Sequence, residues 1–266
     1  MVYKPVGASL QDKCILPHQI YMHTIFQCPY YICSFMGQKK LIRFEEIRSF
    51  PNVLEYPRHM KGAWKTFFKN DNAITLELAC GKGEYAIGLG RLYPEKNFIG
   101  IDIKGNRIWR GAKTAREEGL HNVAFLRSQI DKVTDYFQKD EVAEIWITFP
   151  DPQLRLSKMK KRLTHPHFLR LYQQFLHRDG LIHLKTDSPD LYNFTKSVII
   201  LYDLELLADY NDVYAMPHLN NELKIKTHYE ALDIAQSNRV HYLQFRLNAT
   251  LELEKDAALK QLFSEQ

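Results

Sequence analysis

The chain has 266 residues, of which 45% are hydrophobic and 25% charged, with a net charge of +5 and four cysteines. This is ordinary globular composition, which excludes wholesale disorder and a disulfide-stapled fold. No apolar run reaches about 18 residues, and the start of the chain lacks the pattern of a secretory signal. We therefore expect a cytoplasmic protein without a membrane span.

The first 35 residues differ in composition from the rest of the chain. They are rich in Cys, Tyr, His and Pro, and only Lys4, Asp12 and Lys13 are charged. They show neither a helical nor a strand period. We predict that residues 1–35 form a dispensable extension, disordered or loosely packed, or that Met36 is the biological start. The predicted organisation is an extension at 1–35, a basic segment at 36–72, a main domain at 73–250 and a tail at 251–266.

From residue 73 onward, strand and helix patterns alternate along the chain. The predicted strands are 74–79, 97–103, 122–127, 144–149, 180–187, 204–210 and 240–247, and the predicted helices are 84–93, 104–119, 165–180 and 189–202. This alternation predicts an α/β fold with a mostly parallel, doubly wound sheet and helices on both faces. Ligands of such a sheet bind at the carboxyl ends of its strands.

A glycine turn follows the first of these strands. Gly81 and Gly83 would let the backbone turn sharply and approach a ligand closely, and Asp102 could accept hydrogen bonds from ribose hydroxyls at the end of the second strand. The spacing also satisfies the dinucleotide-binding fingerprint, so an NAD-dependent oxidoreductase is one alternative. Glu77, inside the first strand, favours a cationic ligand such as S-adenosylmethionine over a pyrophosphate. No later segment has the pattern of a hydride-transfer site.

The fourth strand ends in a stiff loop that carries one acid. Pro150 and Pro152 flank Asp151 and restrict its backbone, which favours a fixed carboxylate at the edge of the sheet, although a plain turn is the alternative. The run 155–162 follows with five basic residues in eight, and residues 36–72 carry eight Lys and Arg against four acids. Two such clusters favour contacts with nucleic-acid phosphates over solvated surfaces.

Two further groups of polar residues are candidates for a site. Asp187 ends the fifth strand, and residues 227–230 (Thr-His-Tyr-Glu) offer a hydroxyl, two rings and an acid. The spacing of Thr227 and Glu230 also fits a helix capping box, which is the interpretation that this spacing alone favours, and the two interpretations are compatible. The histidines and cysteines have no metal-ligand spacing, so we expect no metal.

Several motifs together resemble those of bacterial tRNA (guanine-N7-)-methyltransferases. In chain order they are LELACGKGEYAIGLG, FIGID, EIWITFPDP with a basic run ending in KKRLT, HLKTD and THYE, and the resemblance covers residues 36–247. It implies a Rossmann-like class I methyltransferase fold with S-adenosylmethionine as methyl donor. It also implies tRNA as partner, with N7 of the variable-loop guanosine at position 46 as the methylated atom. The sequence is compatible with a monomer or a homodimer.

The resemblance also implies roles for individual residues. The positions that match cofactor-binding residues of the family are Glu77, Gly81, Gly83, Asp102, Gln129 and Asp151. Asp151 also matches the catalytic aspartate. The positions that match substrate-binding residues are Arg155, Asp187, Thr227, His228, Tyr229 and Glu230.

This chain departs from the family pattern at three of its positions. Gln129 stands where an aspartate is common, and its carbonyl can still accept a hydrogen bond from the adenine amino group. Gln153 replaces a tryptophan, and Arg155 replaces a lysine with the charge kept but the geometry changed. The alternative hypotheses are a methyltransferase that acts on a protein or small molecule, and a non-catalytic RNA-binding module.

Overall fold

The computed structural model describes residues 40–232 and 236–264. The chain divides into two compact units, residues 1–41 and 42–266, and the second contains every strand described below. The predictions for residues 1–35 and for a start at Met36 lie outside the described residues.

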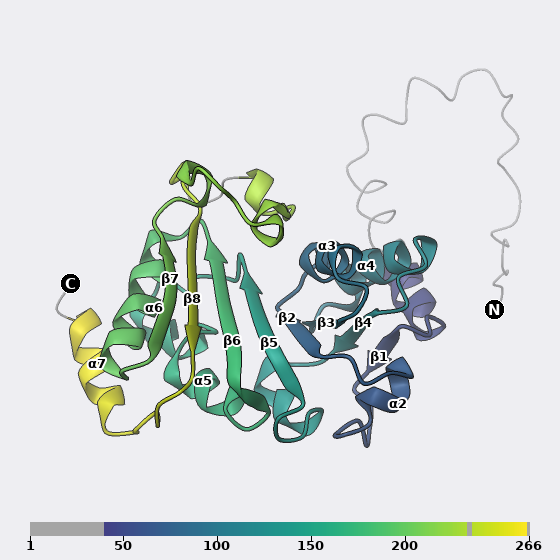
Figure 1. The fold of residues 1–266 in the computed structure, drawn as a ribbon, viewed down its shortest axis with the longest axis horizontal. Helices are drawn as coiled ribbons and strands as arrows, with labels where there is room; N and C mark the ends of the chain where they lie inside the picture. Colours follow the sequence, from purple (N-terminus) through teal and green to yellow (C-terminus); the bar gives the residue numbers. More distant parts are fainter. Residues whose placement is uncertain (1–39, 233–235, 265–266) are drawn as a thin grey trace, which may run out of the picture. The chain divides into compact units, whose positions relative to one another are not determined.

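The second unit is built on one eight-stranded sheet with the strand order β1-β4-β3-β2-β5-β6-β8-β7 (Figure 1). Only β8 runs antiparallel to its neighbours β6 and β7, which confirms the predicted mostly parallel sheet. The strands are β1 (Val53–Glu55), β2 (Ile74–Leu78), β3 (Asn97–Asp102), β4 (Val123–Arg127), β5 (Val142–Thr148), β6 (Leu176–Thr186), β7 (Glu205–Tyr210) and β8 (His241–Arg246).

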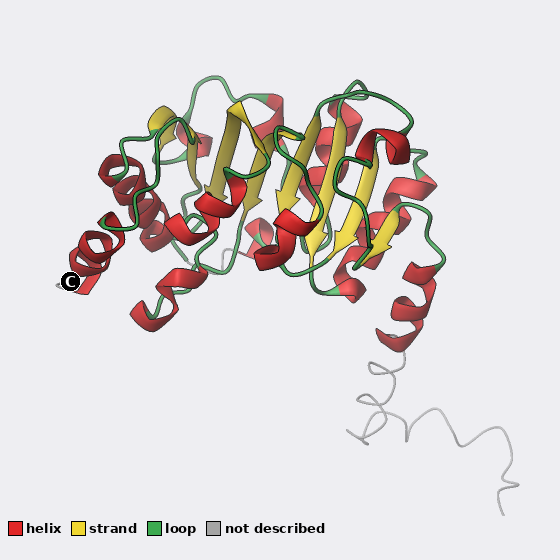
Figure 2. Ribbon diagram, turned by 90° about the horizontal axis from the view of Figure 1, so that it is seen from below, coloured by secondary structure: helices red, strands yellow, loops and turns green. Residues whose placement is uncertain are grey.

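Helices cover both faces of this sheet, as predicted (Figure 2). They are α2 (Trp64–Phe68), α3 (Glu84–Leu92), α4 (Gly105–Glu117), α5 (Pro166–Tyr172), α6 (Pro189–Leu201) and α7 (Lys255–Ser264). Alternate strand residues face opposite layers. Phe98, Phe125 and Trp146 pack with α3 and α4, whereas Leu76 and Ile145 pack in the layer that contains α2, α5, α6 and α7.

The predicted helix at 165–180 is wrong over its second half. The helix α5 ends at Tyr172, and residues 176–180 form the start of β6, with Gly180 inside the strand. Leu176 pairs with Val142 of β5, so sheet pairing overrides the local helical pattern.

The expected boundaries at 72/73 and 250/251 do not coincide with breaks in packing. Trp64 of α2 is fully buried and donates from Nε1 to the carbonyl of Tyr136 at 2.8 Å. At the other end of the chain, Leu259 of α7 is fully buried, and Asp256 accepts a hydrogen bond from Arg170 at 2.6 Å. Residues from 42 onward and the expected tail therefore pack on the same core as residues 73–250.

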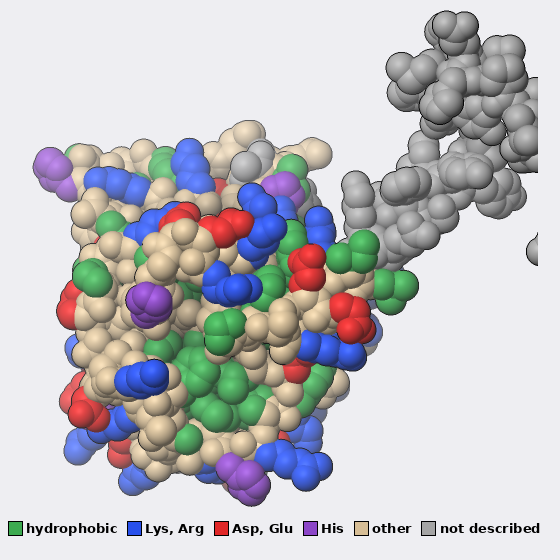
Figure 3. Space-filling model, turned by 90° about the vertical axis from the view of Figure 1, so that its right-hand side faces the viewer, with side chains coloured by type: hydrophobic (Ala, Val, Ile, Leu, Met, Phe, Trp, Pro, Cys, Tyr) green, Lys and Arg blue, Asp and Glu red, His purple; other side chains and the backbone are tan. Residues whose placement is uncertain are grey.

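The surface at the β1 edge of the sheet carries a patch of hydrophobic side chains bordered by Lys and Arg (Figure 3).

Of the helices in the described ranges, none has the length and apolar character to cross a bilayer.

Candidate active site

The glycine loop after β2 has the backbone geometry that its sequence predicts. Gly81 and Gly83 have φ angles of +56° and +71°, which favour glycine, and Gly83 directly precedes α3. A Cβ on Gly81 would meet only the Tyr229 ring, at 3.7 Å. Open space therefore lies in front of this glycine, where a ligand can approach the backbone.

One aromatic ring fixes the loop from beneath. The ring of Phe125, on β4, lies 2.3 Å from where a Cβ on Gly83 would stand. The same ring lies 2.8 Å from a Cβ built on Gly100 and 2.7 Å from one built on Gly111. Three glycines from the loop, β3 and α4 thus leave the space that a single phenylalanine fills.

Asp102, at the end of β3, holds the loop from the side. Its carboxylate accepts hydrogen bonds from the backbone N–H of Gly81 at 3.0 Å and of Lys104 at 2.7 Å. Each carboxylate oxygen keeps further acceptor capacity for a ligand hydroxyl. The side chain is buried but lies on the wall of two cavities.

Glu77 is buried beneath the loop, with 2% of its surface exposed. It accepts hydrogen bonds from the N–H of Ala86 at 2.8 Å and from Oγ1 of Thr148 at 3.3 Å. Burial raises the pKa of Glu77 to about 8, and the hydrogen bond from Ala86 opposes that rise only in part. Burial therefore favours the neutral carboxyl at pH 7, and a cation bound beside it would favour its ionised form.

Two cavities lie at the carboxyl edge of the sheet and share Ala79 and Asp102 as walls. One, of about 770 Å³, extends past Gln129 towards Lys160 and Lys161. The other, of about 750 Å³, is lined by residues that include Asp151, Asp187 and Tyr229. An elongated ligand can therefore lie across Asp102 with its two ends in different cavities.

The loop that carries Asp151 is anchored by an arginine from the basic run. Arg162 is 5% exposed, donates to the carbonyls of Pro152 at 3.1 Å and Gln153 at 3.3 Å, and packs over the Phe194 ring at 4.5 Å. Asp151 itself accepts from the N–H of Gln153 at 3.0 Å. The expectation that the whole run contacts phosphates is wrong for Arg162, because its guanidinium is buried against this loop. The exposed members of the run are Arg155, Lys158, Lys160 and Lys161.

Residues 227–230 form the capping box that their spacing predicts. The N–H of Glu230 donates to Oγ1 of Thr227 at 3.1 Å, and the N–H of Thr227 donates back to Glu230 at 3.2 Å. Thr227 and Glu230 thus support the turn from inside. His228 is exposed, and Tyr229 is half-buried on a cavity wall.

A buried lysine that the sequence analysis did not single out holds this turn. Lys185 of β6 is fully buried and donates to the carbonyls of Leu223 and Ile225, both at 3.0 Å, and to Glu230 at 3.1 Å. Burial lowers the pKa of Lys185, whereas the charge of Glu230 raises it. A lysine inside a predicted buried strand was the available signal, because a buried charge requires a partner.

Within residues 40–232 and 236–264, no group of three or more His, Cys, Asp or Glu side chains is placed to hold a metal ion.

Comparisons with known proteins agree with this geometry. Residues 71–243 match a family model described as "Putative methyltransferase". The chain is 48% identical to the tRNA (guanine-N(7)-)-methyltransferase of Porphyromonas gingivalis, over 76% of this chain and 86% of that protein. It is 46% identical to the protein of the same name from Christiangramia forsetii, over 80% of this chain and all of that protein.

The fold also resembles solved methyltransferase structures. The 16S rRNA methyltransferase KamB matches 70% of this chain, and 92% of its own length, with 12% identity and a TM-score of 0.53. The 16S rRNA (adenine(1408)-N(1))-methyltransferase from Catenulisporales acidiphilia matches the same shares with 15% identity and a TM-score of 0.50. At such low identity the likeness shows a common fold, and it supports the expected Rossmann-like class I methyltransferase architecture.

Proposed function

This chain belongs to the tRNA (guanine-N7-)-methyltransferase family, and from this membership we propose that it methylates N7 of the variable-loop guanosine, position 46, of tRNA with S-adenosylmethionine as donor. The observation that carries the proposal is identity of 44–48% to relatives of that name over at least three quarters of the chain. Because tRNA is found in the cytoplasm, we propose that the protein acts there.

The residues at the edge of the sheet fit this methyl donor. When bound, S-adenosylmethionine supplies a methyl group activated by a sulfonium cation. The open space before Gly81 would admit its amino-acid part, and Asp102 would accept hydrogen bonds from its ribose hydroxyls. Gln129, on the wall of the 770 Å³ cavity, would accept from the adenine amino group.

Glu77 would act on the donor through charge. Its carboxyl is neutral when no cation is near, because burial raises its pKa to about 8. A sulfonium and an ammonium beside the glycine loop would stabilise the carboxylate, and the ionised Glu77 would in turn hold the cationic ligand. The buried acid Glu77 beneath the loop favours the cationic methyl donor at this place over the pyrophosphate of a dinucleotide.

We propose Asp151 as the catalytic residue. Guanine N7 has a free lone pair and no proton to lose, so the reaction requires alignment for in-line displacement rather than a general base. The transferred methyl leaves the guanine ring cationic, and a fixed carboxylate stabilises that developing charge. Asp151 has a suitable place for this role, on a cavity wall and on a loop held by two prolines and by Arg162.

The remaining proposed substrate residues divide by their environment. Asp187 and Tyr229 line the same cavity as Asp151, where a base turned out of the tRNA stack would be bound. Arg155 and His228 are exposed and suited to contact the tRNA outside that cavity. Thr227 and Glu230 would contribute indirectly, because their polar groups hold the turn that presents His228 and Tyr229.

The test is transfer of tritiated methyl groups from S-adenosylmethionine to unmodified tRNA, followed by mapping of the product base. We expect 7-methylguanosine at the variable-loop position, and we expect it to be missing from tRNA of a strain in which the gene is deleted. Incorporation into protein with none into tRNA would favour the alternative methyltransferase. Binding of tRNA without any incorporation would favour a non-catalytic module.

A further inference from the structure

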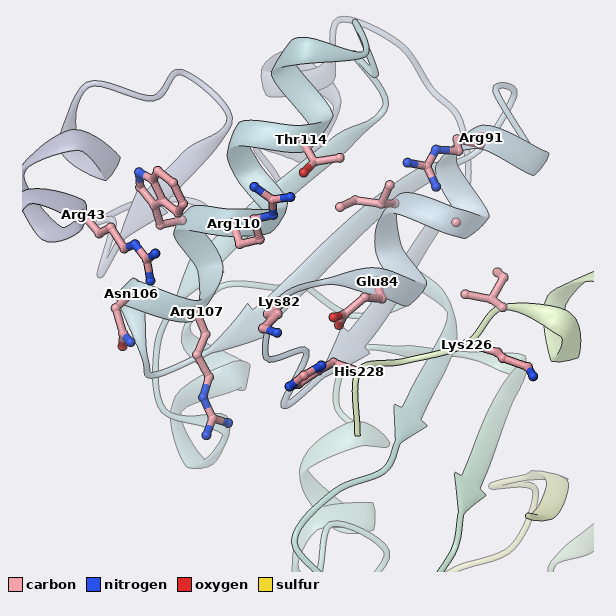
Figure 4. Close-up of a pocket in the computed structure, with 14 residues that line it drawn as sticks. Arg43, Lys82, Glu84, Arg91, Asn106, Arg107, Arg110, Thr114, Lys226 and His228 are labelled. Carbon is pink, nitrogen blue, oxygen red and sulfur yellow. The ribbon is translucent and has the colours of Figure 1, made fainter. Parts of the chain in front are cut away.

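A large basic cavity lies beside the helices α3 and α4, outside the proposed reaction site (Figure 4). It has a volume of about 940 Å³. Its cationic walls come from four parts of the chain, namely the segment before β1, the glycine loop, α4 and residues 225–228. The basic side chains of these walls are Arg43, Lys82, Arg107, Arg110 and Lys226, and Arg91 of α3 lies at the rim.

The charge in this cavity is largely uncompensated. Arg91 is bound by Glu118 at 2.6 Å, but none of the other five basic side chains has a carboxylate oxygen within 4.0 Å in the described part of the chain. Among the described residues that line the cavity, Glu84 is the single acidic one. By contrast, several arginines elsewhere are paired with acids, as Arg127 is with Glu55 and Arg170 with Asp256. Like charges gathered in this way repel one another, and a polyanion relieves that repulsion.

The basic cavity adjoins the cavity of Asp151. Arg107 lines both, and its guanidinium lies 5.4 Å from the centroid of the Tyr229 ring. The neighbouring His228 lines the basic cavity, while Tyr229 lines the other. A polymer whose base enters the Asp151 cavity can therefore continue across Arg107 into the basic cavity.

We propose that this basic cavity binds the sugar–phosphate backbone of tRNA next to the nucleotide that is methylated, with Arg107, Arg110 and Lys226 facing successive phosphates. The inference rests on the proposed function, because it takes tRNA as the polymer. Cations spread over four segments of the chain match a row of phosphates better than one phosphate group. The site is distinct from the 155–162 run, whose Lys160 and Lys161 lie by the 770 Å³ cavity instead.

The decisive experiment compares a variant that lacks two positive charges of the basic cavity with a control variant that lacks two positive charges elsewhere. The test variant is Arg110→Gln with Lys226→Gln. The matched control is Arg178→Gln with Lys139→Gln, which removes the same charges at the opposite edge of the sheet, where β5 and β6 begin. Binding of unmodified tRNA is measured over a range of salt concentrations, in the presence of S-adenosylhomocysteine.

Each lost phosphate contact is expected to lower the log–log salt slope by about 0.7–0.9. Two lost contacts therefore lower it by about 1.4–1.8 and weaken binding about 25–60-fold at 0.1 M salt. The control should keep the slope of the wild type, and calorimetry should find the same affinity for S-adenosylhomocysteine in all three proteins.

Trp109 gives an independent measure of occupancy. It lines the basic cavity, whereas Trp64 and Trp146 are 0% and 2% exposed, so quenching of tryptophan fluorescence by iodide reports mainly on Trp109. Bound tRNA should protect this fluorescence from iodide in the wild type and the control, and protect it less in the test variant.

The outcomes separate this inference from the proposed function. If the wild type methylates tRNA but the test variant keeps the slope, affinity and protection of the control, the inference is overturned and the proposed function stands. If the wild type binds tRNA without methylating it, the proposed function fails, while a lowered slope in the test variant still supports the cavity as an RNA site.

Discussion

Replacing Glu77 with glutamine should make the ligand-free protein more stable at neutral pH. The folded-state pKa of Glu77 is about 8, above its usual 4.5, because the side chain is buried. The stabilising contribution of this group is therefore complete below pH 4.5 and is lost as the pH rises towards 8. Each pH unit in that window lowers the free energy of unfolding by about 1.4 kcal/mol, so this loss of stability reaches about 3 kcal/mol at pH 7.

Glutamine keeps the shape and the hydrogen bonds of the neutral acid. Its amide can accept from the N–H of Ala86 and donate to Oγ1 of Thr148, the two partners of Glu77. It cannot ionise in the unfolded chain, so the pH-dependent loss disappears. Relative to the wild type, Glu77→Gln should be about 3 kcal/mol more stable at pH 7 and nearly unchanged close to pH 4.5.

Urea unfolding followed by circular dichroism at pH 5, 6, 7 and 8 measures this difference. Glu117→Gln is the control, because Glu117 is an exposed carboxylate on α4 with a loose partner, Lys113, at 3.8 Å. Its effect should stay within about 0.5 kcal/mol at every pH. A Glu77→Gln effect that does not vary with pH would refute the assignment of a neutral, buried carboxyl.

The same substitution tests the proposed interaction of Glu77 with the methyl donor. Binding of a cationic ligand at pH 7 should release a proton from Glu77, so the calorimetric heat should depend on the ionisation enthalpy of the buffer. Glu77→Gln should bind S-adenosylmethionine more weakly and show no such dependence. Equal proton release by both proteins would remove Glu77 from the cofactor site.

The other predictions concern four further residues. Asp151→Asn should lower kcat by about 10²–10³-fold while tRNA binding stays nearly unchanged, and its pH–rate profile should show no general-base limb near neutral pH. A near-normal kcat at saturating tRNA and cofactor would move the catalytic assignment to Asp187. Asp102→Ala should weaken binding of S-adenosylhomocysteine by about 1–3 kcal/mol in calorimetry, and an unchanged affinity would exclude it from the cofactor site. Lys185→Met should destabilise the protein by about 3–5 kcal/mol in urea unfolding because it leaves Glu230 buried without a cation, and the double variant with Glu230→Gln should recover part of that loss. Arg162→Met should lower kcat, because it releases the loop that carries Asp151, and it should leave the salt slope of tRNA binding unchanged. A reduced slope would show that Arg162 contacts a phosphate of the tRNA.

The sequence predicted those features that depend on local patterns. Buried strands are short apolar runs, so β2 to β5 were found within about two residues of their observed ends, and Gly81 and Gly83 marked the loop. The capping box of Thr227 and Glu230 was also predicted, because it depends on a spacing of three residues.

Features that depend on distant partners could not be predicted in the same way. Nothing around Arg162 in the sequence distinguishes it from Lys160 and Lys161, and only the fold brings it against Phe194 and the loop of Asp151. The basic cavity was missed for the same reason. Its residues are far apart in the chain, and those on α4 lie in a region of balanced charge between the two basic stretches.

The ring of Phe125 has a consequence for how this protein can evolve. Gly83, Gly100 and Gly111 each leave space for that ring, so an added methyl group at any one of them would push the ring towards the other two. A single substitution at these positions should therefore deform the cofactor loop, although Phe125 itself lies behind the loop. A smaller residue at 125 would relieve the crowding of alanine at position 100, whereas alanine at 83 would still meet an unfavourable φ of +71° and alanine at 111 would still meet the carbonyl oxygen of Lys82 at 2.3 Å. Across the family, positions 100 and 125 should therefore co-vary, whereas positions 83 and 111 should stay glycine whatever residue stands at 125.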